Sequence, residues 1–274
     1  MFTYRLSWFG PLNSRVSMPG ALVLSCSSAA ETVFPVTSTT SAPFVKFRSG
    51  DGIRIFTPSG ELPFAGHPSL GTAVAVARTK GATTASYVQQ THAGLQPIDV
   101  TLDGATAHAS MLQNPAQHGT EPSTAAVLAA VGLQDGDGHP DWPPQVVSTG
   151  VAHVVAPLRD TAALERAAAH PSLLGDVLLE LGATCVYLAA VDAGAGTARA
   201  RSFFLGDVGT LEDPATGSAV GPLVAYLAER AGITELTVSQ GAEMGRPSTL
   251  HAVVEGDRIR VSGDVVIVAE GHSL

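Results

Sequence analysis

One short motif occurs twice in this chain, each time where an extended segment gives way to a helical one. The first copy is Pro68–Val74 (PSLGTAV) and the second is Pro214–Val220 (PATGSAV). Each copy follows an Arg-x-Phe segment, so a strand, a loop and a helix start recur in the same order. The repetition predicts duplicated halves that face each other. The alternative is two unrelated helix starts that both use Pro, Gly and a hydroxyl residue.

The second copy also predicts how its helix begins. Asp213 precedes Pro214, and this pair favours a helix entry, because Asp caps free N–H groups and Pro suits the first turn. A start one turn later, at Thr216-Gly217-Ser218, is the alternative. Either start leaves backbone N–H groups at the positive end of a helix, which favours a bound anion.

Composition narrows the class of protein. The chain has 274 residues, of which 45% are hydrophobic and 14% charged, and its net charge is -9. These values indicate a globular protein without the basic footprint of a nucleic-acid binder. Cys26 and Cys185 form neither a metal-binding spacing nor a disulfide framework, and no apolar run is long enough to span a membrane. We expect a cytoplasmic protein that binds neither nucleic acid nor membrane.

The pattern of apolar residues predicts an α+β fold with mostly antiparallel strands around one small-residue helix in each half. We expect the halves to be residues 1–115 and 116–274, separated near the turn-rich segment Asn114–Pro122. The expected helices cover residues 67–80, 123–131, 160–169, 173–181 and 217–230. The expected strands cover residues 4–9, 21–26, 31–36, 44–48, 52–57, 87–91, 98–102, 108–113, 146–148, 153–157, 185–191, 199–205, 236–239, 249–254 and 258–269.

Several common chemistries are excluded. Ser218 lacks the glycine spacing of a hydrolase elbow, and Thr72 has no preceding Lys as a nucleotide P-loop would require. The nine His residues show no paired spacing for zinc, and no dinucleotide fingerprint is present. The sequence therefore gives no support for a zinc site or a dinucleotide site.

A cleft between the two helix starts is the remaining hypothesis. His67 and Asp213 stand at equivalent positions of the two motifs, and Thr72 and Ser218 supply hydroxyls. Such a site would hold a small carboxylate and could move a proton on it. The alternatives are structural: His67 would be a helix cap or a core histidine, and Asp213 would only cap its helix.

Three separated segments resemble the PhzF family of phenazine-biosynthesis-like isomerases, which share the diaminopimelate-epimerase fold. They are Glu61–Pro68 (ELPFAGHP), Glu212–Ala219 (EDPATGSA) and Gln240–Ser248 (QGAEMGRPS). The resemblance covers nearly everything from about Ala30 to the C-terminus. It implies two pseudo-symmetric barrel-like halves, each around a central helix, with the active site between them. It also implies a homodimer without metal or organic cofactor.

The resemblance further implies roles for individual residues. The family's acid/base glutamate lies in a short stretch that Ala30–Phe34 (AETVF) matches, so Glu31 is the candidate. Its catalytic His and Asp fall on His67 and Asp213. The substrate-binding positions are Gly66, Gly71, Thr72, Gly217 and Ser218. Neither motif carries a cysteine, which excludes the two-thiol mechanism of related racemases.

We therefore expect an isomerase of the trans-2,3-dihydro-3-hydroxyanthranilate isomerase type, or a related double-bond isomerase. Glu31 would remove a proton from a conjugated carboxylate of secondary metabolism and return it elsewhere, and partial burial would fit its pKa to both steps. Two alternatives remain. One is a binding protein without turnover, favoured because the chain lacks the family's Gly-Asn-Pro lead; the other is an amino-acid epimerase or racemase.

Overall fold

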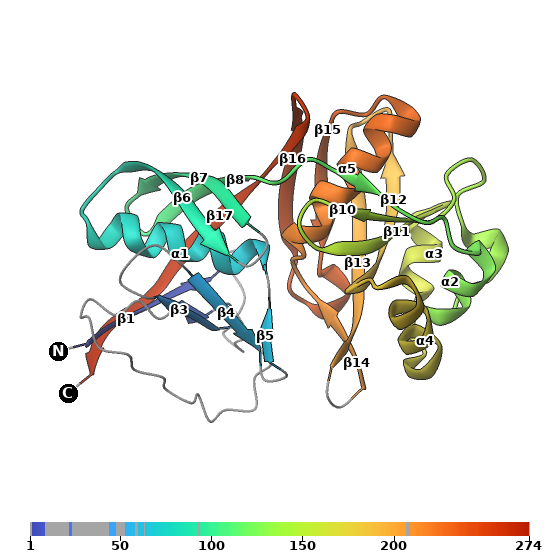
Figure 1. The fold of residues 1–274 in the computed structure, drawn as a ribbon, viewed down its shortest axis with the longest axis horizontal. Helices are drawn as coiled ribbons and strands as arrows, with labels where there is room; N and C mark the ends of the chain where they lie inside the picture. Colours follow the sequence, from blue (N-terminus) through green and yellow to red (C-terminus); the bar gives the residue numbers. More distant parts are fainter. Residues whose placement is uncertain are drawn as a thin grey trace. The chain divides into compact units, whose positions relative to one another are not determined.

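The computed structural model describes residues 2–8, 22–23, 44–47, 53–57, 60–62, 64–91, 94–206 and 209–273 (Figure 1). The chain forms two compact units, Met1–Leu112 with Ser262–Leu274, and Gln113–Val261. We call them the N-terminal and the C-terminal unit. The predicted halves 1–115 and 116–274 differ from this division in the last residues, which group with the N-terminal unit.

In the described part of the N-terminal unit, strands pack against the helix α1 (Gly66–Thr79). Its remaining elements are β1 (Phe2–Trp8), β2 (Leu22–Val23), β3 (Phe44–Phe47), β4 (Ile53–Thr57), β5 (Gly60–Leu62), β6 (Thr84–Thr91), β7 (Gly94–Asp103), β8 (Thr106–Leu112) and the later part of β17 (Arg258–Ser273). One sheet has the order β6-β7-β8-β17, with β1 antiparallel to β17, and β2 to β5 form a second sheet. Helix α1 is buried along most of its length, because its residues are small enough for strands to approach closely.

The C-terminal unit has the same plan around α5 (Gly217–Ala231), with an additional helical layer. Its other elements are β9 (Gln117–His118), α2 (Thr124–Ala130), η1 (Asp135–Asp137), β10 (Gln145–Ser148), β11 (Ala152–Leu158), α3 (Thr161–Arg166), α4 (Pro171–Leu181), β12 (Cys185–Asp192), β13 (Thr197–Gly206), β14 (Gly209–Asp213), β15 (Glu235–Gln240), η2 (Ala242–Met244) and β16 (Ser248–Glu255). The sheet has the order β17-β16-β15-β13-β12-β11-β10-β9, and β14 pairs with β13. The pairs β11–β12 and β13–β15 are parallel.

Strand β12 shows why this unit needs two helical layers. Cys185, Tyr187 and Ala189 belong to the core cluster that surrounds α5. The residues between and after them, Val186, Leu188 and Ala190, belong to a second cluster, which also contains apolar residues of α2, α3 and α4. A strand covered on both faces is apolar at every position, whereas a half-exposed strand alternates.

The α+β class is confirmed, and the predicted helices and strands within the described residues are present with ends shifted by a few residues. The predicted strand over residues 31–36 lies outside them. Strands β5, β9 and β14 and the two 3-10 turns were not predicted.

The prediction that Asp213 and Pro214 open a helix was wrong. Asp213 is the last residue of β14, and α5 begins at Gly217 after the cap residue Thr216. The alternative start one turn later is therefore confirmed. By contrast, α1 begins at Gly66, so Pro68 lies inside that helix. The two motifs are alike in sequence but occupy different positions relative to their helix starts.

Candidate active site

The candidate site of the C-terminal unit is the loop that carries the chain from β14 into α5. Asp213 ends the strand, and three residues later Thr216 occupies the N-cap position of the helix. The Thr216 hydroxyl donates a hydrogen bond of 2.7 Å to Oδ2 of Asp213. The loop therefore presents the half-buried carboxylate of Asp213, and one oxygen of this carboxylate already accepts a hydrogen bond from Thr216.

Gln240, at the end of β15, holds this loop through three hydrogen bonds of its side-chain amide. Its Nε2 donates to the Asp213 carbonyl at 2.6 Å and to Thr216 Oγ1 at 2.9 Å, and its Oε1 accepts from the Thr216 N–H at 3.2 Å. The next residue, Gly241, has a φ of 83°, and a Cβ there would lie 2.8 Å from the Pro214 carbonyl oxygen. Glycine is required at this position by both its conformation and the close approach of the loop.

A second glutamine, Gln113, forms a hydrogen bond with the first turn of α5. Its Nε2 donates to the Gly217 carbonyl at 3.0 Å, and its Oε1 accepts from the Thr149 hydroxyl at 2.6 Å. Gly221 makes room for it, because a Cβ at that position would lie 2.9 Å from Gln113 Cδ. Two buried glutamines thus fix the entry of α5.

The N–H groups of this entry are partly unused. Gly217 N–H donates to the Ala215 carbonyl at 3.2 Å, and Ala219 N–H donates to the Thr216 carbonyl at 2.9 Å. Among the described residues, no acceptor bonds the N–H of Ser218. A donor at the positive end of a 15-residue helix suits an anionic group of a ligand.

A buried histidine, His153, lies next to the backbone of Ser218. Pro222 has no N–H, so the Ser218 carbonyl does not receive the hydrogen bond that an α-helix would give it. His153 lies against the Ser218 backbone, and its Nδ1 lies 3.1 Å from the Cys185 Sγ. Burial lowers the pKa of His153 to about 4 and raises the pKa of Cys185 to about 12, so at neutral pH the imidazole is neutral and the thiol protonated.

This histidine makes stability depend on pH. The unfolded chain binds a proton at His153 below about pH 6.5, but the folded chain does so only below about pH 4. The free energy of unfolding should therefore fall as the pH drops through this window, by about 2 kcal/mol at pH 5. Urea unfolding of wild type and His153→Gln at several pH values measures this effect. An equally steep pH dependence in the variant would contradict the assignment.

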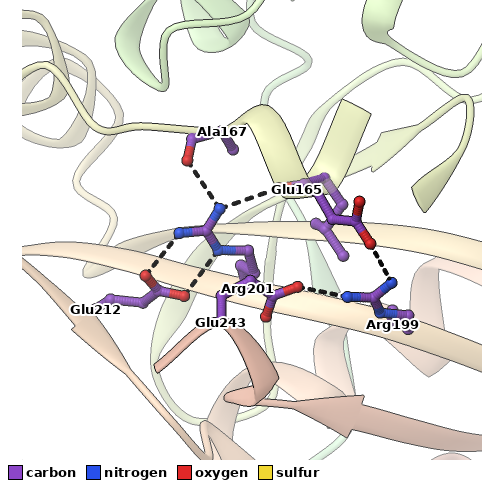
Figure 2. A network of polar contacts seen from close by, with 7 residues as sticks. Glu165, Ala167, Arg199, Arg201, Glu212 and Glu243 are labelled. Carbon is purple, nitrogen blue, oxygen red and sulfur yellow. Dashed lines mark hydrogen bonds and ion pairs between the residues drawn. The ribbon is translucent and has the colours of Figure 1, made fainter. Parts of the chain in front are cut away.

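A network of arginines and glutamates anchors β14 and η2 (Figure 2). Arg201 of β13 forms two hydrogen bonds of 2.8 Å with the Glu212 carboxylate and also donates to the carbonyls of Leu164 and Ala167. Arg199 donates to Glu165 and Glu243. The hydrogen bonds with Glu212 raise the pKa of Arg201. Glu212 immediately precedes Asp213, so this network fixes the strand that presents the candidate carboxylate.

Four predicted residues of the N-terminal unit lie on α1, namely Gly66, His67, Gly71 and Thr72. Gly66 is its first residue and is buried, and His67 is half-buried in the first turn. Gly71 and Thr72 lie one turn further along. The N–H of Gly71 is therefore within the helical hydrogen-bonding pattern. The Thr72 hydroxyl is buried without a hydrogen-bond partner within the described part of the chain.

The structure thus brings Asp213, Gly217 and Ser218 together at the entry of α5. Glu31 lies outside the described residues. Three buried residues that support the loop, Gln113, Arg201 and Gln240, were not predicted. Gln240 had a signal because it opens the third motif, Gln240–Ser248, and Arg201 had one because it begins the Arg-x-Phe segment before the second motif copy. Gln113 had none. Over the described ranges, no group of three or more His, Cys, Asp and Glu side chains could hold a metal ion. No described helix is long and apolar enough to cross a membrane.

Comparison with known proteins places the chain in a family. The family model described as phenazine biosynthesis-like protein, PhzC-PhzF, matches residues 26–271. A trans-2,3-dihydro-3-hydroxyanthranilate isomerase of Pseudomonas aeruginosa is 37% identical over 242 residues, which cover 82% of this chain and 80% of that protein. The enzyme of the same name from Pseudomonas chlororaphis is 34% identical over 231 residues, covering 80% of this chain and 77% of that protein. A predicted epimerase from Pseudomonas aeruginosa has a similar structure, with a TM-score of 0.79, 28% identity and coverage of 100% of this chain and 99% of the other. The chain belongs to the phenazine biosynthesis-like protein family, PhzC-PhzF.

Proposed function

We propose that this chain is an isomerase that moves a proton on a small conjugated carboxylate, with trans-2,3-dihydro-3-hydroxyanthranilate as the first candidate substrate. The reaction class follows from relatives of that name that are 34% and 37% identical to this chain. The entry of α5 is the structural observation that supports it. There the Asp213 carboxylate and the open N–H of Ser218 offer an acceptor and a donor a few residues apart.

In the proposed reaction, Glu31 acts as the acid/base. Its carboxylate takes a proton from an activated carbon, and the electron pair of that C–H bond shifts into the conjugated system. The protonated Glu31 then returns the proton to another carbon of that system. The reaction needs no oxidant, reductant or co-substrate, because one C–H bond breaks and another forms. A single group that both takes and gives a proton suits this chemistry.

The remaining residues bind and orient the substrate in this proposal. The Ser218 N–H, with Gly217 beside it, takes the substrate carboxylate, and the free oxygen of Asp213 takes its amine or hydroxyl. His67 polarises the same substrate. Gly66, Gly71 and Thr72, which lie near His67 on α1, are the remaining substrate-binding residues in this proposal. The homodimer implied by the resemblance and the cytoplasmic location expected from the composition remain part of the proposal.

The test is incubation with trans-2,3-dihydro-3-hydroxyanthranilate in deuterated water. An isomerase should convert the substrate and place solvent deuterium in the product, as seen by mass spectrometry and NMR. Deuterium exchange and inverted configuration without double-bond movement would indicate an epimerase or racemase instead. Tight binding with neither exchange nor conversion would indicate a binding protein. Either of these results would overturn the proposal.

A further inference from the structure

We infer that Gln240 and Thr216 are positioning residues that fix the direction of every hydrogen bond around Asp213, so that one of its oxygens stays available to the substrate. This inference rests on the proposed function of Asp213. It concerns residues that would not touch the substrate themselves. It follows from four hydrogen bonds of one amide group, each with a partner in the C-terminal unit.

The orientation of the Gln240 amide is determined by its partners. The Thr216 N–H can only donate, so the atom 3.2 Å away must be the acceptor Oε1. The Asp213 carbonyl can only accept, so the atom 2.6 Å away must be the donor Nε2. Rotating the amide by half a turn would place donor against donor and acceptor against acceptor. Gln240 is 1% exposed, so water cannot replace these partners.

The orientation of Gln240 in turn sets the direction of the Thr216 hydroxyl. Nε2 of Gln240 donates to Thr216 Oγ1 at 2.9 Å, so this oxygen acts as an acceptor there. Its own proton is then directed at Asp213 Oδ2, 2.7 Å away. If this proton pointed elsewhere, the hydroxyl oxygen and the Asp213 oxygen would face each other as two acceptors. The arrangement therefore makes Oδ2 the oxygen that Thr216 holds and fixes the rotation of the carboxylate.

Tyr187 provides the last hydrogen bond to the Gln240 amide. Its hydroxyl donates to Oε1 of Gln240 at 2.9 Å. Burial raises the pKa of Tyr187 well above its usual value, so the phenol keeps its proton and remains a donor. Oε1 of Gln240 thus accepts two hydrogen bonds while Nε2 donates two. A fully satisfied amide of this kind is rigid, because any rotation leaves a buried polar atom without a partner.

The consequence for Asp213 is an asymmetric carboxylate. Oδ2 accepts from Thr216, whereas no described residue donates to Oδ1. Among the neighbouring ionisable groups, Cys185 and Tyr187 on β12 keep their protons through burial, and Glu212 is paired with Arg201 on β13. The orientation of the Asp213 carboxylate thus depends chiefly on the hydroxyl of Thr216.

Three substitutions test the inference. Thr216→Val keeps the shape but removes the hydroxyl, Thr216→Ser keeps the hydroxyl, and Gln240→Glu replaces Nε2 with an oxygen that cannot donate. We expect Thr216→Val and Gln240→Glu to lower kcat/KM about 10- to 100-fold, as loss of a hydrogen bond to a charged group does. Thr216→Ser should retain activity within about threefold. A purely structural role would not separate Ser from Val in this way. Gln145→Glu, at another buried glutamine of this unit, is the matched control and should leave kcat/KM unchanged.

A second measurement keeps the inference testable if the wild type shows no turnover of the chosen substrate. Crystal structures of the wild type, Thr216→Val and Thr216→Ser report the orientation of the Asp213 carboxylate directly. We expect the carboxylate to turn away from residue 216 in Thr216→Val and to keep its contact with the hydroxyl in Thr216→Ser. An unchanged carboxylate orientation in Thr216→Val would overturn the inference, whatever the activity. Absence of wild-type turnover with the expected change of orientation would instead count against the proposed function alone.

Discussion

Glu31→Gln is expected to abolish turnover of the candidate substrate, with kcat lowered by about a thousandfold or more. The amide has nearly the same shape as the carboxylate but cannot take a proton from carbon, and general acid–base catalysis contributes about 10²- to 10⁴-fold. KM should change little, because the groups proposed to hold the substrate remain. Steady-state kinetics and the rate of deuterium exchange measure the two effects.

The control for this variant is Glu180→Gln, which removes one exposed carboxylate of α4 and should leave kcat unchanged. Thermal unfolding of both variants establishes that they fold as the wild type does. A folded Glu31→Gln protein with near wild-type exchange would remove Glu31 from the mechanism. His67 and Asp213 would then be the acid/base candidates, and the same substitutions at those positions would distinguish them.

Arg201→Met is expected to produce the largest loss of stability, about 3 kcal/mol. The substitution leaves the Glu212 carboxylate without its two hydrogen bonds of 2.8 Å, in a place where only 16% of that side chain is exposed. It also leaves the carbonyls of Leu164 and Ala167 without the guanidinium that bonds them. Uncompensated buried charge is costly, because the protein interior solvates it poorly. Urea unfolding monitored by circular dichroism measures the loss.

Arg199→Met is the matched control for this prediction, because Arg199 lies two residues away on β13 and also pairs with two glutamates. Its side chain is 36% exposed, so water screens these pairs and the expected cost is below about 1 kcal/mol. Equal losses from the two substitutions would show that the buried position of Arg201 does not matter. The double variant Arg201→Met with Glu212→Met should recover part of the loss, since no charge is left unpaired.

Local patterns predicted most elements of this fold. The run at Cys185–Val191 predicted β12, and the small apolar residues after Gly217 predicted α5, because both patterns come from burial along one element. Strand β14 was missed because its last residues, Glu212 and Asp213, are acidic and precede a proline. Its existence depends on pairing with β13, which a local pattern does not record.

The helix starts show a second limit. Pro68 and Pro214 stand in nearly identical motifs, yet Pro68 lies within α1 and Pro214 lies before α5. Part of the difference comes from Gln240 and Gly241, which hold the chain around Pro214 in a loop. These partners are distant in sequence. A glutamine such as Gln113, which bonds a carbonyl 104 residues away, carries no local sign of that role.

Strand β17 has a consequence for biosynthesis. Its first residues, up to Val261, belong to the C-terminal unit, and from Ser262 onward it belongs to the N-terminal unit, where it pairs with β1. The ribosome produces the part of this strand from Ser262 onward only after the C-terminal unit, Gln113–Val261, has been translated. The N-terminal unit, although its first strands emerge before the C-terminal unit, can therefore complete its hydrogen-bonded sheet only after that unit has been synthesised. Until then the edges of β1 and β8 lack their neighbour and remain open to mispairing with other chains.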